Sequence, residues 1–268
     1  MAKGAMRGAV LVAVAALAFG ARPAAAEELT YDGATTIGKQ VMTEAAPAFQ
    51  AKTGVKFSKI GMSGAGKGLK AALAGEVSVA GVSRSLTQDE LAQKPYFKII
   101  GYDALGVFVN AANPVKVLTK TQLKAIYSGQ VTNWKALGGP DLAIVACSEK
   151  LNSGRATVDA FKNRVLDGKS YGPVKELDDA SDCVKFVATS KGAVAPASLA
   201  YAIQGTRALP VDGIKPTDDD VRAGTYALAR PLLLVTKSPP QGALKQFFDF
   251  MLSVEGQKFV DKSFVSVR

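Results

Sequence analysis

Residues 29–49 read LTYDGATTIGKQVMTEAAPAF, a stretch that contains a short strand, a loop of glycine and hydroxyl residues, and a helix. The helix is predicted because Ile37, Val41, Ala45 and Phe49 recur every fourth residue and so share one apolar face. Beyond this unit, apolar strands and helical segments continue to alternate along the chain. The alternation predicts an α/β fold with mainly parallel, doubly wound sheets.

Two helix starts carry a pattern that reinforces this interpretation. Residues 87–90 (TQDE) and 119–122 (TKTQ) each place a threonine three residues before a glutamate or glutamine. This spacing is typical of a capping box, in which the two side chains bond to each other's backbone N–H groups. We therefore expect a helix to begin at each position.

Two apolar segments bear on the number of domains. The strands expected at residues 104–109 and 231–236 are flanked by loops, so the chain can cross between two lobes there. We expect a two-strand hinge, with residues 27–109 and 231–268 in lobe 1 and residues 110–230 in lobe 2. The 242 residues that follow the first 26 can hold one large domain or two of ordinary size.

The first 26 residues have the pattern of a secretory signal peptide. Lys3 and Arg7 precede an apolar run from Ala9 to Phe19, and the small residues 24–26 (AAA) follow. The run is shorter than the roughly 20 residues that cross a bilayer, and no cysteine follows the expected cleavage site to carry a lipid. We expect a protein free in the periplasm; the alternative is a buried N-terminal helix.

Composition argues against several functional classes. The chain has 33 Lys and Arg against 23 Asp and Glu, but they are spread along it without the clustered stripe of a nucleic-acid binder. It has no histidine, which removes Ser-His-Asp catalysis and His-containing metal sites. We therefore expect no catalytic residues, metal, cofactor or nucleic-acid partner. In an exported protein, Cys147 and Cys183 predict one disulfide, with two free thiols as the alternative.

Three loops bring glycine and hydroxyl side chains to expected helix starts: residues 33–36 (GATT), 63–68 (SGAGKG) and 152–155 (NSGR). Free backbone N–H groups and the positive end of the helix dipole favour an anion there. Each loop alone is explained by ordinary helix capping. Three together, at strand-to-helix turns where α/β proteins bind ligands, favour a small oxyanion. The second loop is no nucleotide P-loop, because Gly68 stands where that motif needs Ser or Thr.

The order of the motifs resembles the phosphate-binding component of bacterial phosphate ABC importers. Besides the three loops, the resemblance rests on residues 82–84 (VSR), 113–115 (NPV), 118–119 (LT), 122–123 (QL), 126–129 (IYSG), 132–134 (TNW), 138–139 (GG) and 253–257 (SVEGQ). It covers essentially the whole chain after the leader. The resemblance implies a two-lobed type II periplasmic-binding fold, phosphate held between the lobes, a membrane ABC permease as partner, and a monomer.

The resemblance also implies site residues. The first lobe would bind with Thr35, Thr36, Ser63 and Gly64, and the second with Ser153 and Gly154. At two positions this chain departs from the family: Arg84 replaces an aspartate that accepts the phosphate proton, and Glu149 replaces an anion-clamping arginine. We expect Arg84 to clamp the anion and Glu149 to pair with Arg84 or to accept a proton from monohydrogen phosphate. Arg155 is a second clamp or points to solvent.

The leading interpretation is a periplasmic protein that captures phosphate for an ABC importer, and three alternatives remain. The changed residues at positions 84 and 149 would also suit another small oxyanion or an organic ligand. A periplasmic phosphate-ester enzyme is disfavoured by the absence of histidine and of a dense carboxylate set. A sensing role is compatible with the same site. The acidic residues 218–220 are explained more simply as a helix start than as a metal site.

Overall fold

The computed structural model describes Met1 and residues 27–268. The predicted signal peptide therefore lies outside the described residues, apart from Met1. The strands are β1 (Leu29–Gly33), β2 (Phe57–Ile60), β3 (Val79–Val82), β4 (Tyr96–Asn110), β5 (Val145–Glu149), β6 (Lys175–Leu177), β7 (Ala193–Ser198), β8 (Thr206–Leu209), β9 (Ala229–Thr236) and β10 (Val265–Ser266).

The helices are α1 (Thr35–Ile37), α2 (Thr43–Thr53), α3 (Ala65–Ala74), α4 (Gln88–Ala92), α5 (Lys120–Tyr127), α6 (Ala156–Val165), α7 (Ala180–Thr189), α8 (Asp218–Arg222), α9 (Gly242–Met251) and α10 (Val254–Asp261). A π-helical turn, η1 (Gly38–Met42), joins α1 to α2, and two short 3₁₀ segments are η2 (Trp134–Leu137) and η3 (Leu199–Tyr201). Both predicted capping boxes are present, at the starts of α4 and α5.

One curled sheet runs through the described chain in the order β2-β1-β3-β9-β4-β7-β5-β6, and β8 and β10 also pair with β4. The outer parts are parallel, because β1 pairs with β2 and β3, and β5 with β6 and β7, in that sense. The centre is antiparallel, since β9 pairs so with β3 and β4, and β4 with β7, β8 and β10. The expected mainly parallel pairing thus holds in the outer parts and is corrected at the centre.

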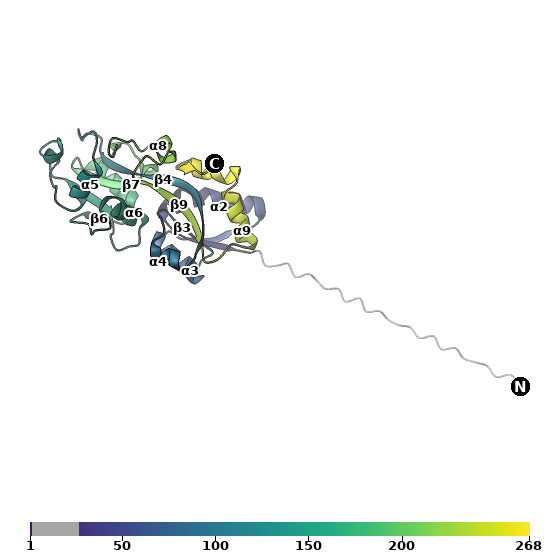
Figure 1. Ribbon diagram of the computed structural model, residues 1–268. Coiled ribbons are helices and arrows are strands. Elements are labelled where there is room, and N and C mark those ends of the chain that lie inside the picture. The colour runs from purple at the N-terminus through teal and green to yellow at the C-terminus, as the bar shows by residue number, and fades with distance from the viewer. Residues whose placement is uncertain (2–26) are drawn as a thin grey trace.

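The strands β4 and β9 connect two halves of the molecule (Figure 1). The 15-residue strand β4 pairs with β9 from Tyr96 to Ala104 and then with β7 from Leu105 to Val109. It therefore belongs to both halves of the sheet and starts earlier than the sequence predicts. The lobe boundaries expected from the sequence remain a prediction.

Each half has an apolar core of its own. In the half that holds the N-terminal strands, Phe49 of α2 packs edge-to-face on Phe247 of α9, with ring centroids 5.3 Å apart. In the other half, Tyr127 of α5 packs on Phe161 of α6 at 4.6 Å, near the fully buried Trp134. Aromatic burial of this kind stabilises each half separately.

The two cysteines meet but are not bonded in the structure. Cys147 of β5 and Cys183 of α7 are buried free thiols whose sulfur atoms lie 2.8 Å apart. A disulfide needs about 2.05 Å between the sulfurs. The predicted disulfide is therefore wrong here, and the alternative of two thiols describes the structure.

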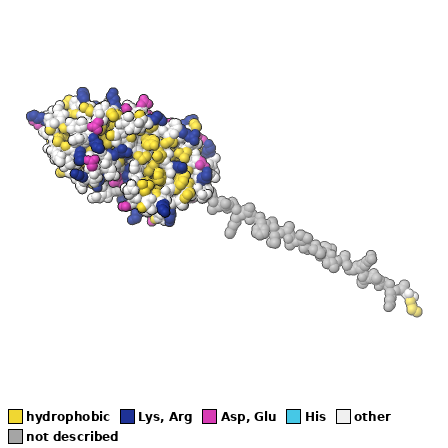
Figure 2. Space-filling model, in the orientation of Figure 1, with side chains coloured by type: hydrophobic (Ala, Val, Ile, Leu, Met, Phe, Trp, Pro, Cys, Tyr) yellow, Lys and Arg dark blue, Asp and Glu magenta, His cyan; other side chains and the backbone are white. Residues whose placement is uncertain are grey.

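The surface is mixed in charge. Figure 2 shows Lys and Arg scattered over both halves of the visible face, with acidic side chains among them. This distribution agrees with the spread of basic residues along the sequence. Over residues 27–268, none of the helices combines the length and the apolar character that a bilayer crossing requires.

Candidate functional site

A small polar cavity lies where the starts of three helices meet between the halves. It is lined by Ala34, Thr35 and Thr36 at the start of α1, Gly64 and Ala65 at the start of α3, Ser83 after β3, Glu149 at the end of β5, and Arg155, Ala156 and Thr157 at the start of α6. Both halves therefore contribute to one site, at the carboxyl ends of β1, β3 and β5.

The turn from β1 into α1 depends on Gly33. Its φ angle is +149°, and a Cβ atom at this position would lie 2.2 Å from the carbonyl oxygen of Gly81 on β3. The next residue, Ala34, donates its N–H to the same carbonyl at 2.8 Å. A glycine thus lets α1 begin directly against β3, which brings Thr35 and Thr36 to the cavity.

The cavity is rich in hydrogen-bond donors. The first N–H groups of α1, α3 and α6 have no acceptor within their own helix, and each helix start carries the positive end of a dipole. Hydroxyl groups of Thr35, Thr36, Thr157 and Ser83 add to these donors. Ser83 is fully buried, and within residues 27–268 its hydroxyl has no hydrogen-bond partner. A buried hydroxyl of this kind usually has a partner, such as an ordered water or a bound ion.

Glu149 and Arg155 place opposite charges at the cavity. Their Oε1 and Nε atoms are 3.8 Å apart, and Nη1 of Arg155 donates to Oγ1 of Thr35 at 3.5 Å, across the two halves. Burial raises the pKa of Glu149, the Asp179 carboxylate raises it further, and Arg155 and Arg230 oppose the rise. A carboxyl group with increased proton affinity therefore lines the cavity.

A buried ion pair that the sequence analysis missed lies beside the cavity. Arg230 of β9 donates through Nε to Oδ2 of Asp103 at 2.9 Å, and both side chains are 1% exposed. The same guanidinium donates to the hydroxyls of Thr157 at 3.2 Å and Thr36 at 3.4 Å. The available signal was a charged residue directly beside each apolar run, since Asp103 precedes Ala104 and Arg230 precedes Pro231.

The structure brings together five of the nine residues expected at the ligand: Thr35, Thr36, Gly64, Glu149 and Arg155. Their assembly follows from the three glycine-rich helix starts and the end of β5. Whether each contacts a ligand remains a prediction.

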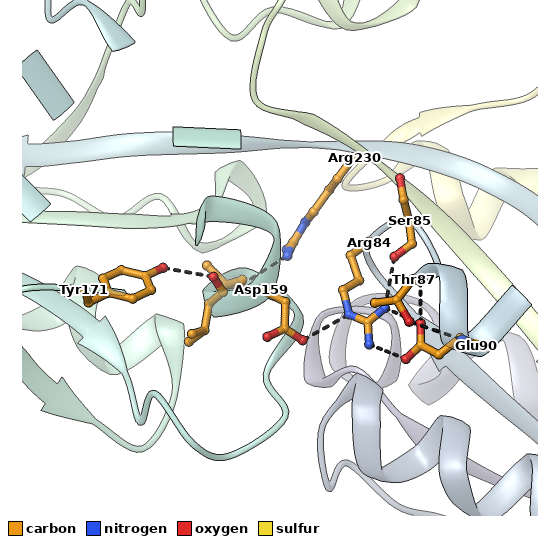
Figure 3. A network of polar contacts seen from close by, with 9 residues as sticks. Arg84, Ser85, Thr87, Glu90, Asp159, Tyr171 and Arg230 are labelled. Atoms are coloured by element: carbon orange, nitrogen blue, oxygen red, sulfur yellow. Dashed lines mark hydrogen bonds and ion pairs between the residues drawn. The ribbon is translucent and has the colours of Figure 1, made fainter. Parts of the chain in front are cut away.

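Arg84 lies outside the cavity, which corrects the expectation that it clamps the anion. Both of its Nη atoms donate to the carboxylate of Glu90, at 2.7 and 2.8 Å, and its Nε donates to Asp159 at 3.1 Å (Figure 3). Two carboxylates and the Ser85 main-chain carbonyl, which accepts from Nη1 at 2.9 Å, thus take up its donors. Glu149 accordingly faces Arg155 and not Arg84.

The other three expected residues bond to the protein itself. Ser63 donates its N–H and its hydroxyl to Asp32, at 2.9 and 2.7 Å. The Ser153 hydroxyl donates to the main-chain carbonyl three residues before it. The Gly154 carbonyl accepts the N–H of Gly66 at 3.0 Å, which joins the two halves beside the cavity. These contacts shape the loops around the site.

No metal centre is suggested by the described part of the chain. Within it, no three Cys, Asp or Glu side chains converge as metal ligands do. The acidic residues 218–220 form the first turn of α8, and the Thr217 hydroxyl caps it by accepting the N–H of Asp220 at 3.2 Å. This agrees with their interpretation as a helix start.

Comparisons with known proteins point to one family. The family model described as PBP superfamily domain matches residues 20–255. A phosphate-binding protein PstS of Staphylococcus epidermidis is 32% identical over 227 residues, which are 77% of this chain and 69% of the relative. Two solved structures are also similar. One is a phosphate ABC transporter substrate-binding protein of Clostridium perfringens with bound phosphate (TM-score 0.83, 32% identity, 90% of this chain and 100% of that one). The other is an ABC-type phosphate transport receptor of Vibrio cholerae (TM-score 0.78, 26% identity, 90% and 100%).

Proposed function

The chain belongs to the phosphate-binding proteins of the PBP superfamily, and we propose that it captures inorganic phosphate between its two halves for delivery to a membrane ABC permease. Its fold is the two-lobed α/β fold of type II periplasmic binding proteins. The family membership gives the class of ligand, and the residues of this chain give the chemistry.

The observation that carries the proposal is the meeting of three helix starts around one small cavity. Backbone N–H groups and helix dipoles at such starts bind phosphate and other oxyanions. The unpaired hydroxyl of Ser83 supplies one further donor that no protein group uses within residues 27–268. A ligand that offers mainly acceptors, as phosphate does, satisfies all of these donors together.

Glu149 selects among oxyanions in this proposal. A carboxylate beside an anion is repelled unless the two share a proton. Monohydrogen phosphate carries such a proton at neutral pH, whereas sulfate does not. The raised pKa of Glu149, caused first by its burial, favours this sharing. The cavity therefore suits phosphate better than sulfate.

Export to the periplasm without a lipid anchor, and a monomeric state, belong to the same proposal. The support for export is the pattern of residues 1–26, with Lys3 and Arg7 before the apolar run. A binding protein that serves a membrane permease acts outside the cytoplasm, so the leader and the proposed function are consistent. A binding role also implies no turnover of phosphate esters.

Calorimetric titration of the ligand-free protein with phosphate and with sulfate, from pH 5 to pH 8, tests the function. The protein is first unfolded and refolded to remove any bound anion. We expect phosphate to bind with a clear preference over sulfate. No heat with phosphate would refute the proposal, and equal heats with both anions would assign the cavity to a less selective oxyanion binder.

A pair of serine variants tests the site. Ser83→Ala removes the buried unpaired hydroxyl and is expected to weaken phosphate binding by about 10-fold, the usual loss for one hydrogen bond to a charged group. Ser85→Ala is the matched control, because Ser85 is exposed and outside the cavity. Equal affinities of the two variants would place the anion elsewhere.

A further inference from the structure

Arg230 lies at the junction of the two halves without belonging to the surface of either. It is carried by β9, one of the two strands that connect the halves, and its side chain is 1% exposed. Figure 3 shows it pointing from these strands toward α6. Its guanidinium lines the neighbouring cavity with Arg84 and Arg164 and approaches the candidate cavity only through its bonds to two threonines.

The guanidinium bonds to one hydroxyl from each half. It donates to Oγ1 of Thr36 in α1 at 3.4 Å and to Oγ1 of Thr157 in α6 at 3.2 Å. A guanidinium has donors and no acceptor, so both hydroxyl oxygens act as acceptors in these bonds. Each threonine thereby keeps its own hydrogen, which lies within reach of the Glu149 carboxylate for Thr157 and of the Tyr201 hydroxyl for Thr36. A ligand in the cavity competes with these acceptors. Both threonines line the cavity.

We propose that Arg230 is a positioning residue that turns the hydroxyls of Thr36 and Thr157 into hydrogen-bond donors for the bound oxyanion. The inference rests on the proposed function, because it assumes an acceptor-rich ligand in the cavity. Without Arg230, either hydroxyl can rotate so that its oxygen faces the cavity, and an oxyanion oxygen without a proton cannot donate a hydrogen bond to it.

Asp103 holds Arg230 in this orientation. Asp103 belongs to β4, and its Oδ2 accepts Nε of Arg230 at 2.9 Å while its Oδ1 accepts the Ser198 hydroxyl at 2.7 Å. The orientation of Arg230 on β9 is thus fixed by Asp103 on the neighbouring strand β4. The threonines come from the two halves, so both bonds to Arg230 form only when the halves are as close as they are in this structure. Arg230 therefore joins one threonine of each half through a single side chain.

The first experiment is phosphate titration of Arg230→Lys. Lysine keeps the charge but carries its donors on one nitrogen, so it cannot reach Asp103, Thr36 and Thr157 together. We expect the Kd for phosphate to rise about 10- to 100-fold. The matched control is Arg164→Lys in α6, whose guanidinium lines the neighbouring cavity and donates to a main-chain carbonyl. Its Kd is expected to stay at the wild-type value.

A double-mutant cycle separates positioning from a merely structural role. Thr157→Val should weaken phosphate binding about 10-fold in the wild-type background and have little further effect in the Arg230→Lys background. Additive losses would overturn the inference, since independent sites contribute additively.

A second cycle avoids Arg230 and so stays informative if Arg230→Lys fails to fold. Thr36→Val and Thr157→Val share Arg230 and should be non-additive. Thr35→Val with Thr157→Val is the control pair, because Thr35 is bonded by Arg155 instead, and it should be additive. If the wild-type protein does not bind phosphate, the proposed function and this inference both fail. If it binds and the cycle of Thr36 with Thr157 is additive, the inference alone fails.

Discussion

Two buried arginines lie where the halves meet, and their partners give them different roles. Arg84 is 5% exposed and is bound by two carboxylates, those of Glu90 and Asp159. Arg230 is 1% exposed and is bound by one carboxylate, that of Asp103, and by two hydroxyls. Residue type and burial do not distinguish them. Arg84 donates to two carboxylates and to the Ser85 carbonyl and so cross-links the protein, whereas Arg230 donates to two hydroxyls that line the cavity.

The carboxylates around the two arginines also differ in their access to water. Asp103 is 1% exposed, whereas Glu90 is 17% and Asp159 is 37% exposed. Water can therefore hydrate Glu90 and Asp159 when Arg84 is removed, but it cannot reach Asp103 when Arg230 is removed. The two clusters should therefore respond differently when the arginine is removed.

The largest expected effect is on stability in Arg230→Met. This change leaves the Asp103 carboxylate buried without its partner, which typically costs about 3–5 kcal/mol in the free energy of unfolding. Arg84→Met should cost less, because water reaches Glu90 and Asp159. Urea unfolding of both variants measures the difference. The double variant Arg230→Met/Asp103→Leu is the control and should recover most of the loss; no recovery would contradict the explanation.

The next effect concerns Glu149. Burial raises the pKa of this carboxyl group, and Arg155 and Arg230 only partly oppose the rise. Glu149→Gln removes the proton acceptor and should weaken phosphate binding by about 10-fold, as expected for a hydrogen bond to a charged group. Sulfate binding should stay the same or improve. Titration with both anions at pH 7 is the measurement, and an equal loss for both would rule out proton sharing as the source of selectivity.

The same variant has a pH signature in the absence of ligand. The folded pKa of Glu149 is raised, so the stability it contributes is complete below its unfolded pKa of about 4.3 and is lost as pH rises through the folded value. Glu149→Gln should therefore unfold at higher urea concentration than the wild type at pH 7, and at the same concentration near pH 4. A difference that grows toward acid would have the wrong sign.

The parts of the fold that the sequence predicts correctly are those marked by local patterns of residues. The capping boxes at Thr87 and Thr119 and the glycine-rich helix starts are local patterns, and the structure has helices at all of them. Strand direction is not local: β4 pairs with β9 more than 100 residues away, so the antiparallel centre could not be predicted from alternation. The early start of β4 was hidden by its exposed or only partly buried first residues, among them the exposed Lys98.

The site divides in the same way. Thr35, Thr36 and Gly64 were found because each lies at a helix start that the sequence marks. The role of Arg84 was misjudged because Glu90, six residues away, was interpreted only as part of a capping box, and because its second partner, Asp159, is 75 residues away. Arg230 was missed for a similar reason, since 127 residues separate it from Asp103.

A smaller effect should follow from breaking the link that Arg84 makes between the halves. Asp159→Asn leaves the bonds of Arg84 to Glu90 intact and removes only the charge across the junction. For a partly exposed pair we expect a 2- to 5-fold rise in the Kd for phosphate, corresponding to about 0.5–1 kcal/mol, and less of it at 1 M salt. Asp182→Asn is the control, because its pair with Lys185 lies within α7. A loss of phosphate affinity as large as in Arg230→Lys would show that the two arginines contribute equally to binding.

The smallest expected effect tests whether the ion pair of Arg84 with Asp159 is the main electrostatic link between the halves. Lys39 of η1 and Asp179 at the start of α7 form a second ion pair across the junction, at 3.2 Å, with Lys39 40% exposed. Because exposed pairs contribute little, Lys39→Met should raise the Kd for phosphate no more than about 2-fold, compared with Lys245→Met, whose pair with Asp249 lies within α9. A larger loss of affinity than in Asp159→Asn would show that the ion pair of Lys39 with Asp179, and not that of Arg84 with Asp159, is the main electrostatic link. The Asp179 carboxylate also raises the pKa of Glu149. A large loss in Lys39→Met would therefore link the contact between the halves at α7 to the proton affinity of Glu149.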